Sequence, residues 1–268
     1  MSDPVTVRRT GPRSLGQNFL VDRNILDVIE RLAELSDQDV ALEVGAGQGA
    51  LSTRLAAAAR FIHIVELDRS LEEGLRAQLE PFANFELHMA DALTLELTEL
   101  SPPPDKMVAN LPYSVAATVI LRTIEELPSL RSWVVMVQRE VGERFAARPG
   151  TRTYGVPSVL AQLACEVKVL RPVGRGVFRP VPNVDSVLLG LLRRGEPKVT
   201  TAVNPLVHDA FAHRRKALAG SLALKRRTDP GIRERARQAL QDLGLPPDVR
   251  AEKLSPEQFI QLADKLRS

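Results

Sequence analysis

The order of apolar and polar positions over the first half of the chain predicts alternating helices and buried strands. Apolar residues recur at helical spacing between Ile25 and Leu35, and Asp22 precedes them as a candidate helix cap. Short runs of consecutive apolar residues follow, and such runs are typical of strands buried on both faces. The expected strands are residues 40–44, 61–66, 85–88, 106–109 and 132–137. With helices between them, they indicate a parallel, doubly wound α/β sheet, with Trp133 in its core.

The pattern changes in the second half of the chain. Two extended segments, 166–170 and 186–192, are predicted to be antiparallel strands that close one edge of the sheet. A linker rich in turn residues is expected at 195–205. We therefore expect a flexible tail, a catalytic α/β domain and a small all-helical domain, at residues 1–11, 12–195 and 203–268.

The helical domain is predicted from three amphipathic segments. They are residues 205–213, residues 233–243 and a final helix that begins near Ser255. The tetrad Ser-Pro-Glu-Gln at 255–258 places serine at the cap, proline in the first turn and glutamine at the reciprocal capping position.

Composition excludes several classes of protein. The chain has 268 residues and no apolar run near the roughly 20 residues of a membrane-spanning helix, so we expect a cytoplasmic protein. Its single cysteine, Cys165, excludes an internal disulfide and predicts a buried, reduced thiol. Four scattered histidines and one cysteine show no metal-ligand spacing, so no metal is expected. A monomer is the expected state.

Positive charge is concentrated in one stretch. The whole chain has a formal net charge of only +3, but between Lys168 and Arg227 thirteen basic residues accompany three acidic ones, a local net charge of +10. Clusters of this kind suit neutralisation of a phosphate backbone. The candidate RNA-binding residues are Arg214, Arg215, Lys216, Lys225, Arg226 and Arg227.

A glycine-rich loop indicates an adenosine-containing cofactor. The sequence G-A-G-Q-G-A at residues 45–50 follows a predicted strand and precedes a predicted helix, where Gly45 and Gly47 allow a ligand to approach the backbone. Glu66 ends the next strand and is placed to accept both hydroxyls of a ribose, and Asp91 follows the strand after that. The loop fits both dinucleotide and methyltransferase patterns, so it leaves the cofactor open.

The segment Asn110-Leu111-Pro112-Tyr113 favours methyl transfer over hydride transfer. An adenine amino group is a poor nucleophile because its lone pair is delocalised into the ring. The Asn110 side-chain oxygen and the Leu111 main-chain carbonyl are candidate acceptors for its two N–H groups, which favours a pyramidal nitrogen in the transition state. Tyr113 is placed to stack on the base, and no strong general base is required.

Several segments in the same order resemble the ribosomal RNA adenine N6,N6-dimethyltransferases. The resemblance covers nearly the whole chain, from residue 14 to the last helix. It rests on LGQNFL at 15–20, EVGAGQGAL at 43–51, NLPY at 110–113, YG at 154–155, VFRPVPNVDS at 177–186 and FAHRRK at 211–216. Ala46 departs from the proline of many relatives, and Leu111 is more typical of the small-subunit enzymes than of the large-subunit ones.

The resemblance implies a Rossmann-like class I methyltransferase domain that uses S-adenosylmethionine and acts on small-subunit ribosomal RNA within a pre-assembled subunit. It also implies that Phe178 stacks on the target base opposite Tyr113. The implied cofactor-binding residues are Gln17, Asn18, Leu20, Gly45, Gly47, Glu66, Asp91 and Asn110.

Three other interpretations stay open at this point. The chain could methylate adenine in the large ribosomal subunit, or it could be a non-catalytic ribosomal RNA-binding factor that retains the fold. A nicotinamide-dependent dehydrogenase is supported by the glycine loop alone, and no histidine near the site is placed to relay a hydride. Intact Glu66, Asp91 and Asn110 argue for an active methyltransferase.

Overall fold

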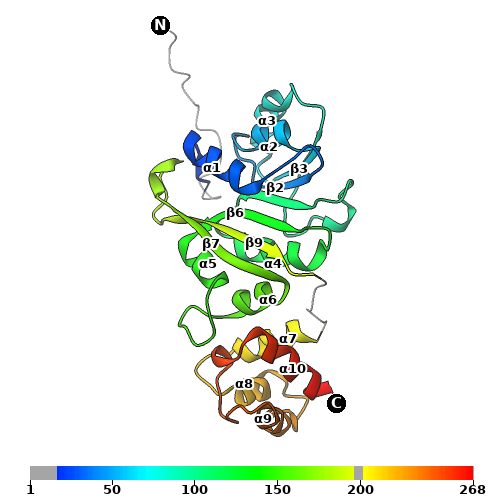
Figure 1. The fold of residues 1–268 in the computed structure, drawn as a ribbon, viewed down its shortest axis with the longest axis vertical. Coiled ribbons are helices and arrows are strands. Elements are labelled where there is room, and N and C mark those ends of the chain that lie inside the picture. Colours follow the sequence, from blue (N-terminus) through cyan, green and yellow to red (C-terminus); the bar gives the residue numbers. More distant parts are fainter. Residues whose placement is uncertain (1–16, 196–201, 268) are drawn as a thin grey trace.

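The computed structural model describes residues 17–195 and 202–267. The predicted tail at residues 1–11 and most of the predicted linker lie outside the described residues. A seven-stranded sheet forms the centre of the larger domain, with the strand order β4-β3-β2-β5-β6-β9-β7 (Figure 1). The strands are β2 (Val40–Val44), β3 (Phe61–Glu66), β4 (Phe85–Met89), β5 (Lys106–Asn110), β6 (Ser132–Gln138), β7 (Cys165–Val173) and β9 (Ser186–Arg193).

The predicted mixture of parallel and antiparallel strands is confirmed. The strands β2 to β6 pair in parallel with one another, whereas β9 pairs antiparallel with β6 and β7 pairs antiparallel with β9. Because the carboxyl ends of parallel strands meet at one edge of a sheet, the segments that follow β2, β3, β4 and β5 are brought close together.

Helices cover both faces of the sheet and create two hydrophobic cores. One core contains apolar residues of the first three helices, and the other contains residues of the next three. Strand β2 contributes to both, with Ala41 on one face and Leu42 on the other, as the two-residue period of a strand requires. These helices are α1 (Arg23–Ala33), α2 (Ser52–Ala58), α3 (Glu72–Leu79), α4 (Ala116–Glu126), α5 (Arg139–Phe145) and α6 (Val156–Ala164).

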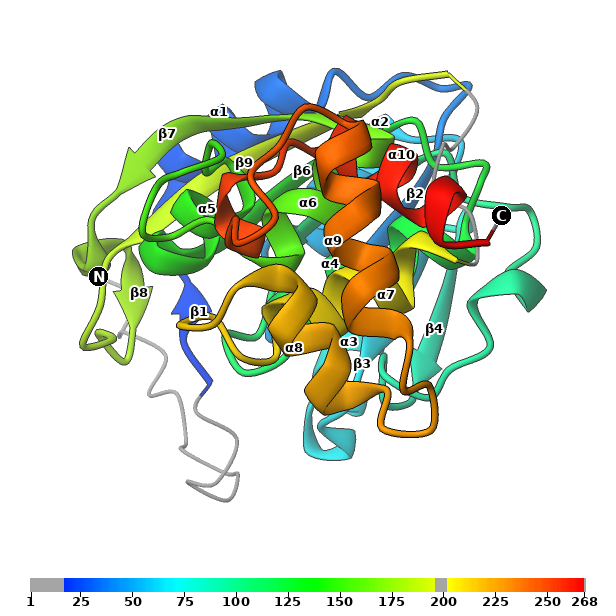
Figure 2. The same ribbon diagram turned by 90° about the horizontal axis from the view of Figure 1, so that it is seen from below.

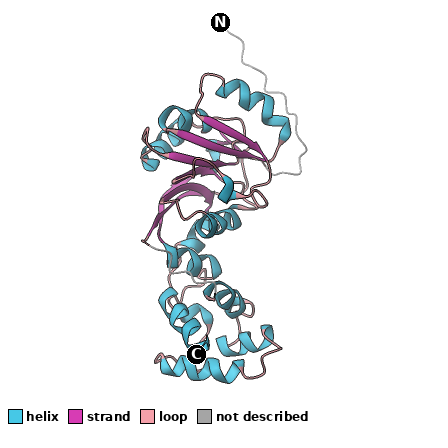
Figure 3. Ribbon diagram, turned by 90° about the vertical axis from the view of Figure 1, so that its right-hand side faces the viewer, coloured by secondary structure: helices cyan, strands magenta, loops and turns pink. Residues whose placement is uncertain are grey.

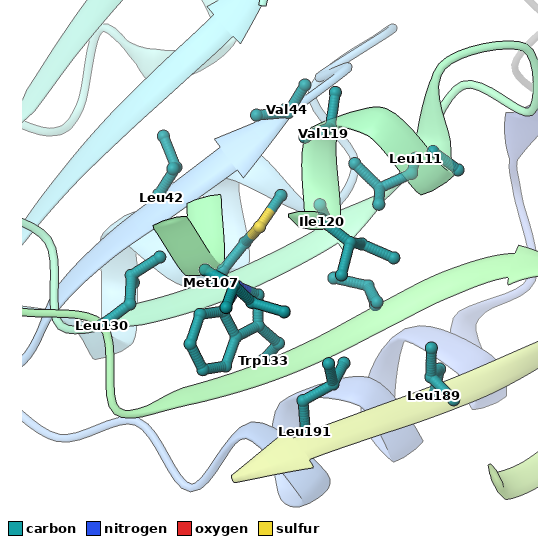
Figure 4. Close-up of a cluster of buried hydrophobic side chains, with 14 of the residues drawn as sticks. Leu42, Val44, Met107, Leu111, Val119, Ile120, Leu130, Trp133, Leu189 and Leu191 are labelled. Carbon is teal, nitrogen blue, oxygen red and sulfur yellow. The ribbon is translucent and has the colours of Figure 1, made fainter. Parts of the chain in front are cut away.

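The buried positions predicted for Trp133 and Cys165 are confirmed. Trp133 is fully buried among Met107, Ile120 and Leu191 (Figure 4), and its indole N–H donates to Thr123 Oγ1 at 3.0 Å. Cys165 is a buried free thiol, and burial raises its pKa to about 11. The predicted cap of the first helix is also present, since Asp22 Oδ1 accepts from the backbone N–H of Ile25 at 3.0 Å.

A short antiparallel pair that the sequence pattern does not predict lies beside the main sheet. It joins β1 (Phe19–Leu20) to β8 (Phe178–Arg179), with Leu20 opposite Phe178. Two residues are too few to show a strand period, so the pairing depends on tertiary contacts. This pair ties the amino-terminal segment to the loop before β9.

The helical domain lies at one end of an elongated molecule (Figure 3). It comprises α7 (Val203–Phe211), α8 (Leu218–Lys225), α9 (Ile232–Asp242) and α10 (Pro256–Arg267), and in the view of Figure 2 α9 lies between α8 and α10. Its core also includes Tyr154 and Leu160 of the larger domain, and the Tyr154 hydroxyl donates to the Leu254 carbonyl at 3.0 Å. The domain is therefore packed against the sheet domain.

Two expectations for this domain are corrected and one is confirmed. Helix α7 begins at Val203, so Asn204 and Pro205 lie in its first turn and not in a linker. Proline is accommodated there because the first N–H groups of a helix have no partner within it. Helix α8 is not among the predicted segments. The cap of α10 is confirmed, since the Ser255 N–H donates to Gln258 Oε1 at 2.8 Å and the Gln258 N–H donates to Ser255 Oγ at 3.3 Å.

Strand pairing also corrects the expectation that the histidines are scattered. In the parallel register of β3 and β4, His63 is opposite Glu86 and Val65 is opposite His88. Alternate residues of a strand share a face, so the two histidines and Glu86 lie on the same side of the sheet. Residues 25 positions apart in sequence thus become neighbours.

Candidate active site

One pocket at the carboxyl ends of the parallel strands brings together nearly all of the predicted catalytic and cofactor-binding residues. It lies between the glycine loop after β2, the ends of β3 and β5, the loop after β4 and the segment that leads into β1. The predicted residues that line it are Gln17, Asn18, Leu20, Gly45, Gly47, Glu66, Asp91, Asn110, Leu111 and Tyr113. Open α/β sheets bind ligands at this edge.

The glycine loop is held between two neighbouring segments. Gly45 has a φ of +82°, and a Cβ at this position would lie 2.9 Å from Pro112 Cδ. Gly47 has a φ of +58°, and its Cβ would lie 2.9 Å from Phe19 Cδ1. Any other residue would combine an unfavourable backbone conformation with a steric clash. The two glycines therefore let the loop pack closely against both the Asn110–Tyr113 turn and β1.

Glu66 is a buried carboxylate whose orientation is set by the backbone. Its Oε2 accepts from the Gly47 N–H at 2.9 Å, and its Oε1 accepts from the Asp68 N–H at 2.8 Å. The residue is only 6% exposed, yet it lines the pocket. An ionised carboxylate accepts about four hydrogen bonds. Both oxygens therefore retain acceptor capacity for a pair of ligand hydroxyl groups.

Asp68 is not among the residues predicted from the sequence, and it anchors Gln17. Asp68 Oδ2 accepts from Gln17 Nε2 at 2.8 Å, while its Oδ1 accepts from the N–H and hydroxyl of Ser70. These hydrogen bonds, with that of the Ser70 hydroxyl foremost, lower the pKa of Asp68. The contact attaches the amino-terminal segment to the loop after β3.

Asp91 lies in the turn after the edge strand β4. Its Oδ1 accepts from the Leu93 N–H at 2.9 Å, which orients the carboxylate. Asp91 lines the pocket at the side of Glu66, whose carbonyl accepts from the N–H of Ala90 at 3.0 Å. Glu66 and Asp91, the two acidic residues of the predicted adenosine site, therefore lie at the hydrogen-bonded ends of the neighbouring strands β3 and β4.

Asn110 presents a buried acceptor to the pocket. Its Nδ2 donates to the Asn18 carbonyl at 3.4 Å, which directs the amide oxygen away from that backbone. The Oδ1 atom is buried and has no hydrogen-bond partner among the described residues. An unsatisfied buried acceptor is destabilising by about 1–3 kcal/mol. Asn110 lines the pocket, so an N–H group of a ligand bound there is a candidate partner for this oxygen.

The residues after Asn110 are held by hydrogen bonds to β6 and β9. The Leu111 N–H donates to the Met136 carbonyl at 3.1 Å. The Tyr113 hydroxyl and the fully buried Ser186 hydroxyl lie 2.6 Å apart. Partial burial raises the pKa of Tyr113, so the ring carries a neutral hydroxyl. The anchored hydroxyl fixes the ring of Tyr113, which lines the same pocket as Asn110.

Phe178 is the one predicted catalytic residue that the structure does not bring into the pocket. It is fully buried, packs in the core with Leu20 and Val173, and is not among the residues that line the cavity. The β1–β8 pairing places it opposite Leu20. The stacking role implied for Phe178 stays a prediction, and it requires movement of this pair.

Glu43 is a pocket residue that the sequence analysis quoted in a motif but did not assign. It is 1% exposed, and burial, reinforced by the nearby Glu66 carboxylate, raises its pKa to about 8. One of its oxygens has no hydrogen-bond partner among the described residues. A charged residue within the apolar strand V-A-L-E-V is the signal that could have identified it.

The predicted RNA-binding residues divide into two groups. Arg214 is engaged internally, because it donates to the carbonyls of Arg152 and Tyr154 at 3.0 and 2.9 Å. Arg226 is engaged internally too, in an ion pair with Asp209 at 2.7 Å. The residues that are exposed and lack an ion pair within the described chain are Arg215, Lys216, Lys225 and Arg227.

Another basic residue of the positive stretch is part of the core. Arg193 donates to the carbonyls of Leu130, Ile124 and Leu127 and lies over the Trp133 ring. It therefore contributes to packing and not to the basic surface. At the junction of the two domains, by contrast, a hollow is lined by Gly150, Arg152, Arg214, Arg215, Arg250 and Glu252.

Comparison with known proteins finds a matching family and close relatives over nearly the whole chain. The model of a family described as ribosomal RNA adenine dimethylase matches residues 8–268. A ribosomal RNA small subunit methyltransferase A from Rubrobacter xylanophilus is 43% identical over 265 residues, covering 98% of both chains. Its counterpart from Kineococcus radiotolerans is 42% identical over 98% of this chain and 88% of that protein.

Solved structures agree with the fold. The 23S rRNA methyltransferase ErmE shares 29% identity at a TM-score of 0.69, over 94% of this chain and 100% of that chain. A dimethyladenosine transferase from Plasmodium falciparum has a TM-score of 0.79 at 24% identity, over 91% and 95% of the two chains, and supports the fold. No helix in the described part of the chain combines the length and apolarity needed to cross a membrane.

Proposed function

The chain belongs to the ribosomal RNA adenine dimethylase family, and we propose that it transfers two methyl groups from S-adenosylmethionine to the N6 amino group of adenines in small-subunit ribosomal RNA. The observation that carries the proposal is the buried, unpartnered Oδ1 of Asn110 in a pocket at the carboxyl edge of the sheet. A hydrogen-bond donor of the substrate would satisfy this acceptor. An adenine amino group supplies such donors.

The pocket fits an adenosine cofactor on its own geometry. The loop at Gly45 and Gly47 lines the pocket, so its backbone atoms would contact a bound ligand. Glu66 retains acceptor capacity for both ribose hydroxyls, and Asp91 would accept from the amino group of the cofactor's adenine. Gln17 and Leu20 would cover the bound molecule from the segment that Asp68 anchors. S-adenosylmethionine supplies an electrophilic methyl group when bound.

Asn110 and Leu111 would activate the target amino group by accepting hydrogen bonds from its two N–H groups. These hydrogen bonds to the Asn110 Oδ1 and the Leu111 carbonyl favour a pyramidal nitrogen. A pyramidal nitrogen has less of its lone pair delocalised into the ring. These contacts stabilise the transition state more than the planar ground state. The excess proton leaves after methyl transfer, so the pocket needs no strong base.

Stacking would hold the flipped base. Tyr113 is anchored by Ser186 at the pocket and offers one face. Phe178 would offer the second face after the β1–β8 pair moves, since it is buried in the present arrangement. Each stacking contact contributes about 1–3 kcal/mol, which offsets the few kcal/mol needed to unstack a base.

The helical domain would bind the RNA backbone. The exposed residues Arg215, Lys216, Lys225 and Arg227 are available to phosphates, whereas Arg214 and Arg226 would keep their internal contacts. Each phosphate contact releases counterions and makes the affinity depend on salt. We infer a monomer that acts in the cytoplasm on small-subunit ribosomal RNA within a pre-assembled subunit.

The first experiment offers radiolabelled S-adenosylmethionine to unmethylated small and large ribosomal subunits in parallel. Dimethyladenosine in the small subunit alone is the expected result. Label in the large subunit would favour the activity named for ErmE, to which the chain is 29% identical. If neither subunit is labelled but the chain still binds ribosomal RNA, the chain would instead be a non-catalytic assembly factor.

A further inference from the structure

Three side chains with metal-ligating atoms meet on the two strands at one edge of the sheet. His63 Nδ1 and His88 Nε2 lie 3.2 Å apart. Glu86 Oε2 lies 3.6 Å from the former nitrogen and 3.7 Å from the latter. The three residues come from β3 and β4 and are absent from the lining of the cofactor pocket. Methyl transfer as proposed above makes no use of them.

A backbone contact orients the His63 ring. Its Nε2 lies 2.8 Å from the Pro102 carbonyl, and a carbonyl oxygen only accepts, so Nε2 carries the proton. The lone pair of His63 is therefore on Nδ1, the atom directed at His88 and Glu86. A histidine that ligates a metal through one nitrogen commonly donates its other N–H to a backbone carbonyl, which fixes its tautomer.

The spacing of the three atoms matches a tetrahedral metal ion. Zinc lies 2.0–2.1 Å from histidine nitrogen and 2.0–2.2 Å from carboxylate oxygen, which separates neighbouring ligand atoms by about 3.3–3.5 Å. The observed separations of 3.2, 3.6 and 3.7 Å differ from this range by only a few tenths of an ångström. Small side-chain rotations would bring all three atoms into range.

The donor set selects the class of metal. Two imidazoles and one carboxylate suit zinc and neighbouring late transition metals, whereas magnesium and calcium prefer oxygen ligands alone. We propose that His63, Glu86 and His88 bind one zinc ion, with solvent in the fourth position. His88 Nε2 faces the His63 lone pair, and as a zinc ligand through this nitrogen His88 would carry its ring proton on Nδ1.

The position of the site indicates a structural role. Strand β4 is an edge strand, and within the described sheet its only neighbour is β3. A metal ion bound by both strands would join them beyond their backbone hydrogen bonds. The adenosine-side residues Glu66 and Asp91 lie three positions beyond His63 and His88, respectively. The ion would thus stabilise the edge of the pocket without touching the reacting atoms.

The test uses the full-length chain without an affinity tag, treated with a chelator and then titrated with zinc chloride. We expect one zinc ion per chain by calorimetry and elemental analysis, together with a rise in Tm, because a ligand that binds only the folded state stabilises it. His88→Gln and Glu86→Gln should each weaken zinc binding at least about tenfold, since even an outer-shell partner is worth 10- to 100-fold.

His208→Gln is the matched control, because His208 is exposed on α7 in the other domain and its loss should leave zinc binding unchanged. His63 is fully buried, so its substitution is not used. Glu86 is about half exposed, so Glu86→Gln tests the site with less risk to folding. Zinc binding that is absent in the parent chain would overturn the proposal. The same holds if binding persists at equal strength in His88→Gln and Glu86→Gln, or disappears in His208→Gln.

Discussion

The pocket and the basic surface of the helical domain place their polar groups in opposite ways. In the pocket, Glu66 is almost fully buried and held by two backbone N–H groups, and the Asn110 amide is directed by the Asn18 carbonyl. On the helical domain, Arg215 and Lys216 are exposed and form no ion pair within the described chain. A small ligand of fixed shape requires the first arrangement, whereas a flexible polyanion tolerates the second. Changes in the pocket should therefore act through geometry, and changes on the surface through charge.

The largest effect is expected at Asn110. Asn110→Ala removes the unpartnered Oδ1 and should reduce the rate of methyl transfer by about 10²–10³-fold, the usual effect of losing one preorganised transition-state contact. RNA affinity should change little, because the basic surface is untouched. Single-turnover methylation and RNA binding measured side by side give both values, and Asn204→Ala on α7 is the control. Unchanged turnover in Asn110→Ala would contradict the proposed mechanism.

A smaller effect is expected at the glycine loop. Gly45→Ala places a Cβ 2.9 Å from Pro112 Cδ at a φ of +82°, a strain of about 1–3 kcal/mol. S-adenosylmethionine affinity should fall by roughly 5- to 150-fold if that strain displaces the loop. Calorimetric titration measures the S-adenosylmethionine affinity. Gly74→Ala on α3 is the control, since its added Cβ meets no atom within 4 Å beyond its own helix backbone and chain neighbours. Equal affinity in both variants would count against a loop shaped by close contact.

The buried acid of the pocket should make stability depend on pH. Glu43 has a pKa of about 8 in the folded chain against 4.5 when exposed, so between these values the folded state retains a proton that the unfolded state has lost. Its contribution is fully present below pH 4.5 and is lost as pH rises towards 8, with a slope of up to about 1.4 kcal/mol per unit.

Glu43→Gln should flatten this part of the profile. Urea unfolding at a series of pH values between 5 and 8 measures the slope, and Glu80→Gln, at an exposed position, should leave it unchanged. A parent-like slope in Glu43→Gln would assign the pH dependence to other groups.

The smallest effect per residue is expected on the basic surface. Arg215→Gln with Lys216→Gln should reduce the slope of log affinity against log salt by about 0.7–0.9 for each lost phosphate contact and leave Tm unchanged. Arg214→Gln should instead lower Tm, because it removes hydrogen bonds to the carbonyls of Arg152 and Tyr154. Arg60→Gln, at an exposed position before β3, is the control for charge alone. A salt slope that does not respond to the double variant would locate the RNA elsewhere.

The histidines and arginines show why part of the site could not be predicted. His63 and His88 are 25 residues apart, and only the register of two parallel strands makes them neighbours. The internal contacts of Arg193 and Arg214 are equally invisible in sequence, where each belongs to a basic cluster. A charge pattern indicates that a positive surface exists, but the folded neighbours decide which side chains remain available for it.

The sequence by itself determined the features that depend on local chemistry. Runs of apolar residues specified the strands, the glycines at 45 and 47 specified a tight turn of the backbone, and the tetrad at Ser255 specified a helix start. Only the tertiary structure decided the burial of Phe178, the pairing of β1 with β8 and the raised pKa of Glu43. The physical reason is range: helix caps, turns and strand periods act over a few residues, whereas burial and side-chain pairing depend on segments brought together from distant parts of the chain.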